Sequence, residues 1–106
     1  MPRPATRDDQ DERPLTTSAL LPLVRRRHGL TQRGLTERLH AVSGNRGVTR
    51  EDVSRWERGK RIPGPYWRHW LSDVLEVPRA ELERAATAAR RSRRLHRDGP
   101  SPTARR

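Results

Sequence analysis

The few large apolar side chains of this sequence fall three and four residues apart. The clearest run places five of them on one face of a helix: Trp67, Trp70, Leu71, Val74 and Leu75. No segment alternates apolar and polar residues with the period of two that indicates a half-buried strand. The spacing therefore predicts an all-α fold.

Composition limits how much of the chain folds. Of the 106 residues, 30% are hydrophobic and 35% are charged, and Phe is absent. Globular domains usually contain about 45–50% apolar residues, so one small core is expected here. With no cysteine, disulfide bonds and zinc ribbons are excluded. No apolar run has the length of a transmembrane helix or a secretory signal, and we expect a cytoplasmic, nucleoid-associated protein with no membrane partner.

Positive charge is concentrated toward the C-terminal end. The net charge of +11 divides into −1 for residues 1–16, +5 for 17–83 and +7 for 84–106. The first segment is rich in proline and is predicted to be a disordered tail. The second is predicted to be the folded domain, and the third an Arg-rich helix end followed by a disordered tail. So basic a chain favours a polyanion as its partner.

Five helices are predicted in the folded segment. We expect Ser18 to cap the first, with Pro22 near its first turn and Gly29 at its end. Thr31 is predicted to cap the second helix, and Thr49 the third.

Two more features mark the later helices. Asp52 lies three residues after Thr49, where the acid of a capping box belongs. Pro65 fits the first turn of the fourth helix, and Pro78 opens the fifth.

The segment from Leu30 to Pro63 carries the most specific pattern. It reads LTQRGLTERL, then a loop, then VTREDVSRWERGKRIP. This resembles the helix-turn-helix domain of the lambda-repressor-like, Xre-type bacterial transcription regulators, over about residues 19–83. The resemblance implies a five-helix lambda-repressor-like fold. It also implies sequence-specific double-stranded DNA binding by a transcriptional regulator, with a recognition helix at about 49–58 in the major groove.

The resemblance also assigns the contacts. Arg50, Glu51 and Arg55 fall at base-reading positions, where arginine pairs with guanine and a carboxylate accepts from cytosine. A half-site containing G·C pairs is therefore expected. The positions expected to contact the DNA backbone are Gln32, Thr49, Ser54, Arg58, Lys60, Arg61 and Arg46, with Arg33 a weaker candidate.

One acid of the recognition helix has a structural role in the family. At the position of Glu57, such domains carry a carboxylate that forms a buried ion pair with an arginine of the first helix. The resemblance implies Arg25 as its partner here.

The sequence departs from the family between the two motif helices. Residues 40–47 intervene where family members have a turn of about three or four residues. Either the second helix continues through Val42 or a loop protrudes. In both cases Asn45 and Arg46 are candidates for contact with the DNA backbone, and we favour the alternative, an insertion that is only solvated.

The same resemblance suggests partners. A homodimer on a pseudo-palindromic operator is expected, with the last two helices as its interface, and a separately encoded regulatory protein is a further candidate partner. The alternatives are an adaptor or antitoxin-like module on the same fold and a nonspecific nucleic-acid-binding protein. The four histidines are scattered and no catalytic grouping occurs, so neither enzyme activity, a metal nor a cofactor is expected.

Overall fold

A computed structural model describes residues 15–98, without the side chains of residues 96–98. This part of the chain contains five helices and no strand: α2 (Thr17–Arg27), α3 (Gln32–Ser43), α4 (Arg50–Glu57), α5 (Pro65–Leu75) and α6 (Arg79–Asp98). The predicted all-α architecture is thus confirmed for the described residues. The two predicted tails lie almost entirely outside them.

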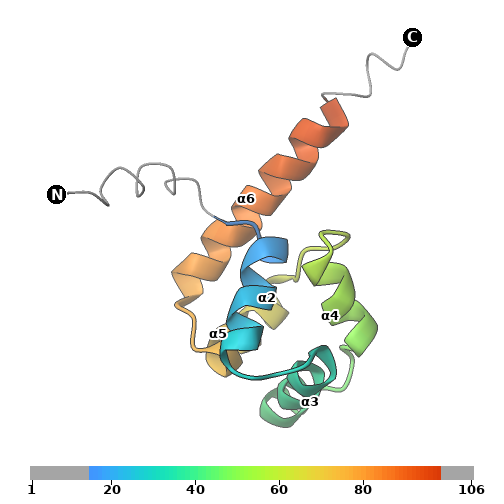
Figure 1. The fold of residues 1–106 in the computed structure, drawn as a ribbon, viewed down its shortest axis with the longest axis vertical. Coiled ribbons are helices and arrows are strands. Elements are labelled where there is room, and N and C mark those ends of the chain that lie inside the picture. Colours follow the sequence, from blue (N-terminus) through green and yellow to red (C-terminus); the bar gives the residue numbers. More distant parts are fainter. Residues whose placement is uncertain (1–14, 99–106) are drawn as a thin grey trace, which may run out of the picture.

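Helix α2 is one member of a closed ring in which each of the five helices packs mainly against two others. It packs against α4 and α6, while α3 packs against α4 and α5, and α5 against α6 (Figure 1). Each helix contributes at least one side chain that is completely buried, including Leu21, Leu35, Val53, Leu71 and Leu82. Burying such a side chain stabilises the fold by about 1.5–3 kcal/mol, so these contacts hold the five short helices together.

The two tryptophans of α5 are less buried than predicted. Trp67 and Trp70 are half-buried and pack against the edge of the core, whereas Leu71, Val74 and Leu75 are buried. The tryptophan of α4, Trp56, is buried instead. The inward face of α5 is therefore rotated relative to the predicted stripe.

The predicted caps hold for two helices and fail for one. Thr31 and Thr49 cap α3 and α4, and Thr49 and Asp52 form the complete capping box. Helix α2 is capped by Thr16 and not by Ser18, because the Thr16 hydroxyl accepts from the Ala19 amide. The earlier start places Pro22 beyond the first turn, where its missing N–H leaves one carbonyl without a helical donor.

The extra residues between the two motif helices mostly lengthen α3. The helix runs to Ser43 and stops at Gly44, whose φ of 71° lies in the left-handed region that favours glycine. The loop that remains is short and braced: the Asn45 side-chain oxygen accepts from the Gly47 amide, and His40 Nε2 lies 2.7 Å from the Val48 carbonyl oxygen. The structure thus follows the first alternative, in which the second helix continues through Val42.

Helix α6 crosses the boundary that was expected after residue 83. Ala85, Ala86 and Ala89 are buried against the other helices, so the domain continues at least to residue 89. The helix starts directly after Pro78, whose carbonyl accepts from the amides of Glu81 and Leu82.

A buried arginine that was not predicted from the sequence joins α5 to α6. Arg68 Nε and Nη2 each lie 2.9 Å from one oxygen of Glu83, and Nη1 lies 2.8 Å from the Pro63 carbonyl oxygen. Arg79 donates to the same carboxylate from one turn away, at 3.1 Å. The hydrogen bonds from Arg68, and then the one from Arg79, hold the pKa of Glu83 below its usual value of 4.5, against an opposing effect of desolvation.

This pair gives a prediction for stability and its pH dependence. Glu83→Gln is expected to lower the free energy of unfolding at pH 7 by about 1–2 kcal/mol. This lies at the low end of the contribution of a hydrogen bond to a charged group, because the Glu83 carboxylate is partly open to water. Since the folded-state pKa is lowered, the carboxylate stabilises the fold above pH 4.5, and this contribution is lost as the pH falls through the folded-state pKa.

Thermal or urea unfolding followed by circular dichroism between pH 3 and 7 measures both effects. The wild type and Glu83→Gln should differ most near neutrality and converge in acid. Glu81→Gln is the matched control, since Glu81 is an exposed carboxylate on the same helix. A wild-type advantage that grew as the pH fell would contradict this role of Glu83.

Candidate nucleic-acid interface

Helix α4 lies at an edge of the domain and is fixed there from its inner side (Figure 1). Val53 and Trp56 are buried against the core, on one face of the helix. The capping box satisfies the amides of Thr49 and Asp52 at its start. The buried face and the capping box thus hold the helix in place, and its opposite face and first turn are left to solvent.

The three residues predicted to read bases all lie on this outer side. Arg50 and Glu51 occupy the first two helical positions and are exposed, and Arg55 follows one turn later, half-buried. Two exposed ion pairs cross the surface: Arg55 lies 3.3 Å from Asp52, and Arg58 lies 3.6 Å from Glu51. Exposed pairs of this kind contribute at most about 1 kcal/mol, so these guanidinium groups are available to an external acceptor at little cost.

Beneath this surface, Arg25 of α2 meets Glu57 of α4. Arg25 Nε and Nη2 lie 2.7 and 3.0 Å from the two carboxylate oxygens, and both side chains are about nine-tenths buried. Arg25 Nη1 donates to the Leu30 carbonyl oxygen at 2.8 Å. This is the ion pair that the sequence led us to expect, and it fastens the end of α4 to α2 and to the turn that precedes α3.

Gln32 connects the buried pair to the exposed surface. Its side-chain nitrogen donates to Glu57 at 2.9 Å, and its side-chain oxygen accepts from Arg50 at 3.4 Å. Gln32 was expected to contact the DNA backbone, but in this structure its amide makes contacts within the protein. It therefore lies between Glu57 and Arg50, and its contact with Arg50 is the longer and more exposed of the two.

The segment that follows α4 carries the remaining expected backbone contacts. Arg58, Lys60 and Arg61 are exposed, and the amides of the last two donate to the Arg55 carbonyl, so the segment folds back over the end of the helix. Gly59 permits this turn with a φ of 76°.

The other expected backbone contacts are more scattered. The Thr49 hydroxyl is engaged in the capping box, and Ser54 is half-buried. Arg46 is exposed in the loop before α4.

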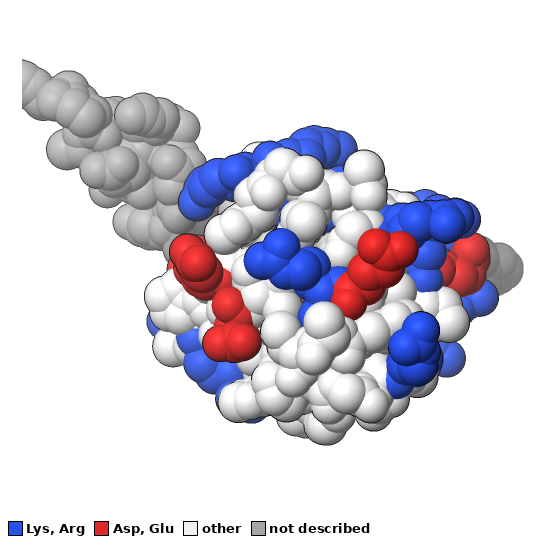
Figure 2. Space-filling model, turned by 90° about the horizontal axis from the view of Figure 1, so that it is seen from below, with Lys and Arg blue, Asp and Glu red and all other residues white. Residues whose placement is uncertain are grey.

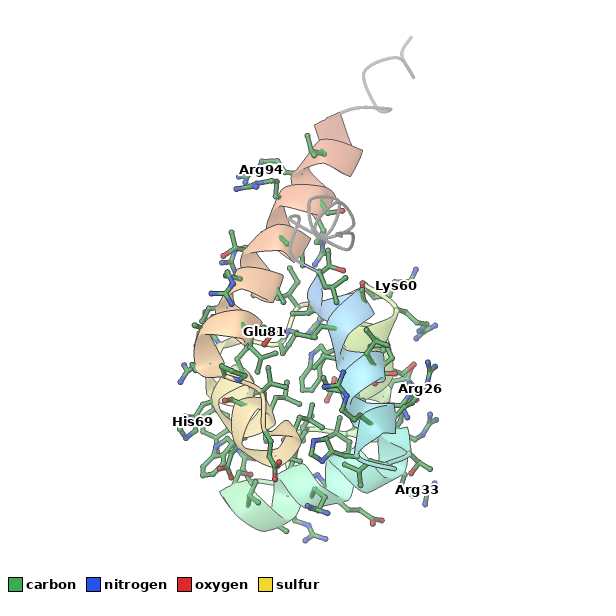
Figure 3. All side chains as sticks on the ribbon, turned by 60° about the vertical axis from the view of Figure 1, so that its left-hand side comes forward. Arg26, Arg33, Lys60, His69, Glu81 and Arg94 are labelled. Atoms are coloured by element: carbon green, nitrogen blue, oxygen red, sulfur yellow. The ribbon has the colours of Figure 1, made fainter. Side chains whose placement is uncertain are left out.

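Additional cations share the edge on which α4 lies. Figure 3 shows Arg26, Arg33 and Lys60 along one side of the domain, with His69 on the other. Seen from the end at which α3 lies, the surface of the domain carries interspersed basic and acidic side chains (Figure 2). Arg26 was not predicted as a site residue. The resemblance singled out Arg25 from the run Arg25-Arg26-Arg27 as the buried member, and the structure adds that Arg26 and Arg27 are exposed.

The described residues contain no group of three or more histidine or acidic side chains placed to hold a metal ion. None of the helices in the same part of the chain is long and apolar enough to cross a membrane. Comparisons with protein-family models, with curated proteins and with solved structures find no match to this chain.

The buried pair gives the first prediction for this site. Glu57→Ala is expected to lower the free energy of unfolding by about 3–5 kcal/mol, because it leaves the Arg25 guanidinium buried without its carboxylate. Small domains have about 5–15 kcal/mol in total, so much of the population should unfold at moderate temperature and any nucleic-acid binding should fall with it. Thermal unfolding by circular dichroism measures the change.

Glu51→Ala is the control, since it removes an exposed carboxylate from the same helix and should leave the melting temperature nearly unchanged. If Glu57→Ala kept the wild-type melting temperature and lost only affinity for nucleic acid, Glu57 would be a contact residue and not a structural one.

Proposed function

We propose that this protein is a sequence-specific double-stranded DNA-binding protein, a bacterial transcription regulator of the lambda-repressor-like, Xre type. In this proposal α3 and α4 form the helix-turn-helix and α4 enters the major groove. The observation that carries it is α4 itself, whose outer face presents Arg50 and Arg55 while its inner end is fastened by Arg25, Glu57 and Gln32.

The dimensions and chemistry of α4 fit this role. A helix with its side chains is about 10–12 Å across, and the major groove of B-DNA is about 12 Å wide. Side chains at the start of such a helix reach the base edges, and Arg50 and Glu51 occupy the first two positions of α4. Arginine presents a fork of donors to guanine O6 and N7, whereas Glu51 accepts from cytosine N4.

Rigidity supports specificity at this site. A recognition side chain distinguishes bases only if its helix keeps a fixed depth and angle in the groove, because each base edge offers donors and acceptors at fixed places. The ion pair fixes the end of α4, and Gln32 gives the exposed Arg50 side chain one partner within the protein before DNA is present. The ordering cost on binding is then smaller for Arg50 than for an unsupported arginine.

The regulator binds as a homodimer in this proposal. Two copies of α4 then enter successive major grooves, about 34–36 Å apart, and the operator repeats its half-site with that spacing. The exposed cations beside α4, among them Lys60 and Arg61, contact phosphates on either side of the groove.

Selection of bound fragments from a random-sequence duplex library tests the proposal. The wild type is expected to enrich a half-site with G·C pairs, repeated about 10–10.5 base pairs apart. Arg50→Ala and Arg55→Ala should each relax the preference at one base pair, with a loss of about 1–3 kcal/mol, or about 5- to 150-fold, on the enriched site.

Arg38→Ala, at an exposed arginine of α3, is the matched control and should keep the wild-type preference. The assignment of α4 as the reading helix would be wrong if the double variant of Arg50 and Arg55 enriched the same sequence as the wild type.

A further inference from the structure

Helix α6 consists of two parts with different surroundings. Its first part packs into the core through Leu82, Ala85, Ala86 and Ala89. No residue from 90 to 95 is buried, yet the helix continues to Asp98. Figure 1 shows this second part projecting beyond the other helices. We call residues 90–97 the distal segment of α6.

The distal segment is a dense array of arginines. Five of its eight residues are arginine: Arg90, Arg91, Arg93, Arg94 and Arg97. Positions 90, 93, 94 and 97 have the spacing of one helix face. Among the described side chains, no carboxylate lies within ion-pair distance of Arg90, Arg91, Arg93 or Arg94. The exposed carboxylates beside α4 are already paired with arginines of that helix and its C-terminal cap.

Such a helix carries an electrostatic cost. Arginines three and four residues apart repel one another along the same face and destabilise the helix. Their place near the C-terminal end of α6 offsets only part of this, through the helix dipole. A polyanion lying along the segment removes the repulsion, so the charges favour an external partner.

The distal segment is connected to the segment that follows α4. Arg93 Nη2 lies 3.3 Å from the Lys60 carbonyl oxygen. Lys60 and Arg61 are themselves exposed, so Arg93 continues the cationic surface that begins at the end of α4. Figure 3 shows Arg94 clear of the body of the domain, on the opposite side of α6 from Lys60.

We propose that the distal segment of α6 is a second DNA-binding element, which lies along the phosphate backbone of the duplex that α4 reads. This rests on the proposed function. The segment carries about one arginine per 2.4 Å of helix axis, comparable with the one phosphate per about 1.7 Å of B-DNA. The guanidinium fork suits phosphate oxygens, and interactions of this class add affinity without reading sequence.

A protein partner fits the same surface less well. Stable protein interfaces depend on buried aromatic or aliphatic anchors at their centre. Among residues 90–95, Leu95 is the one large apolar side chain, exposed over 64% of its surface and surrounded by arginines. The chemistry of the segment therefore favours phosphate.

The salt dependence of binding tests this proposal on the full chain. Arg90→Gln/Arg94→Gln removes two charges from one face of the segment. The control Arg38→Gln/Arg84→Gln removes two charges from exposed positions elsewhere. Affinity is measured from low to high salt on two duplexes, one of random sequence and the one that the wild type selects, and circular dichroism confirms that all variants are folded.

The distal variant should bind both duplexes more weakly by the same factor. Its slope of log affinity against log salt should fall by about 1.8, which is about 0.9 for each phosphate that is no longer neutralised. The control should keep a slope near that of the wild type. Equal changes in the two variants would show an effect of net charge alone and would overturn the proposal. A distal variant that bound DNA like the wild type would also overturn it, and would leave a protein as the partner of this segment.

The two proposals fail in different ways. If α4 does not read sequence, no duplex is preferred or the Arg50 and Arg55 variants keep the preference, while the slope on random duplex still depends on Arg90 and Arg94. If the distal segment does not contact DNA, the preference persists and that slope is unchanged.

Discussion

The ion pair between Arg25 and Glu57 is the interaction on which the arrangement of this domain depends. It joins α2 to the end of α4, and the same guanidinium holds the Leu30 carbonyl in the turn before α3. Three elements are thus fixed around one buried charge pair. Such a pair contributes little more to the free energy of unfolding than apolar packing of the same volume would. Loss of one partner, however, leaves a buried charge unpaired and is strongly destabilising, so both residues have to keep their positions. The direction of α4 is set by that geometry.

The arginines of this domain fall into three groups that differ in burial and in the partners of their guanidinium groups. Arg25 and Arg68 are buried, each paired with one carboxylate and one carbonyl, and both hold helices together. Arginines on the outer face of α4 have exposed, weakly held partners. Those in the distal segment of α6 have no carboxylate nearby among the described side chains. In the two proposals, the first group supports the fold, the second reads sequence and the third adds affinity.

Local features of the sequence predicted most of the fold, and tertiary contacts account for what was missed. The capping box of Thr49 is a contact within four residues, so its residue types identify it. Thr16 and Ser18 are both hydroxyl residues near one helix start, and the sequence does not distinguish them. Arg68 was missed because its partner lies on another helix, fifteen residues away. For the same reason the sequence indicated that Gln32 belongs to the site but not that it bridges Glu57 and Arg50.

The most direct test of the proposed role of α4 is to observe which residues DNA touches. Nuclear magnetic resonance signals of backbone amides and arginine Nε–H groups, followed as the selected duplex is added to the full chain, map the contact surface. We expect the largest changes at Arg50, Arg55 and residues 58–61, with smaller changes at 90–95 that also occur with random duplex. Changes centred on the exposed face of α5, around Tyr66 and His69, with α4 unaffected, would contradict that role.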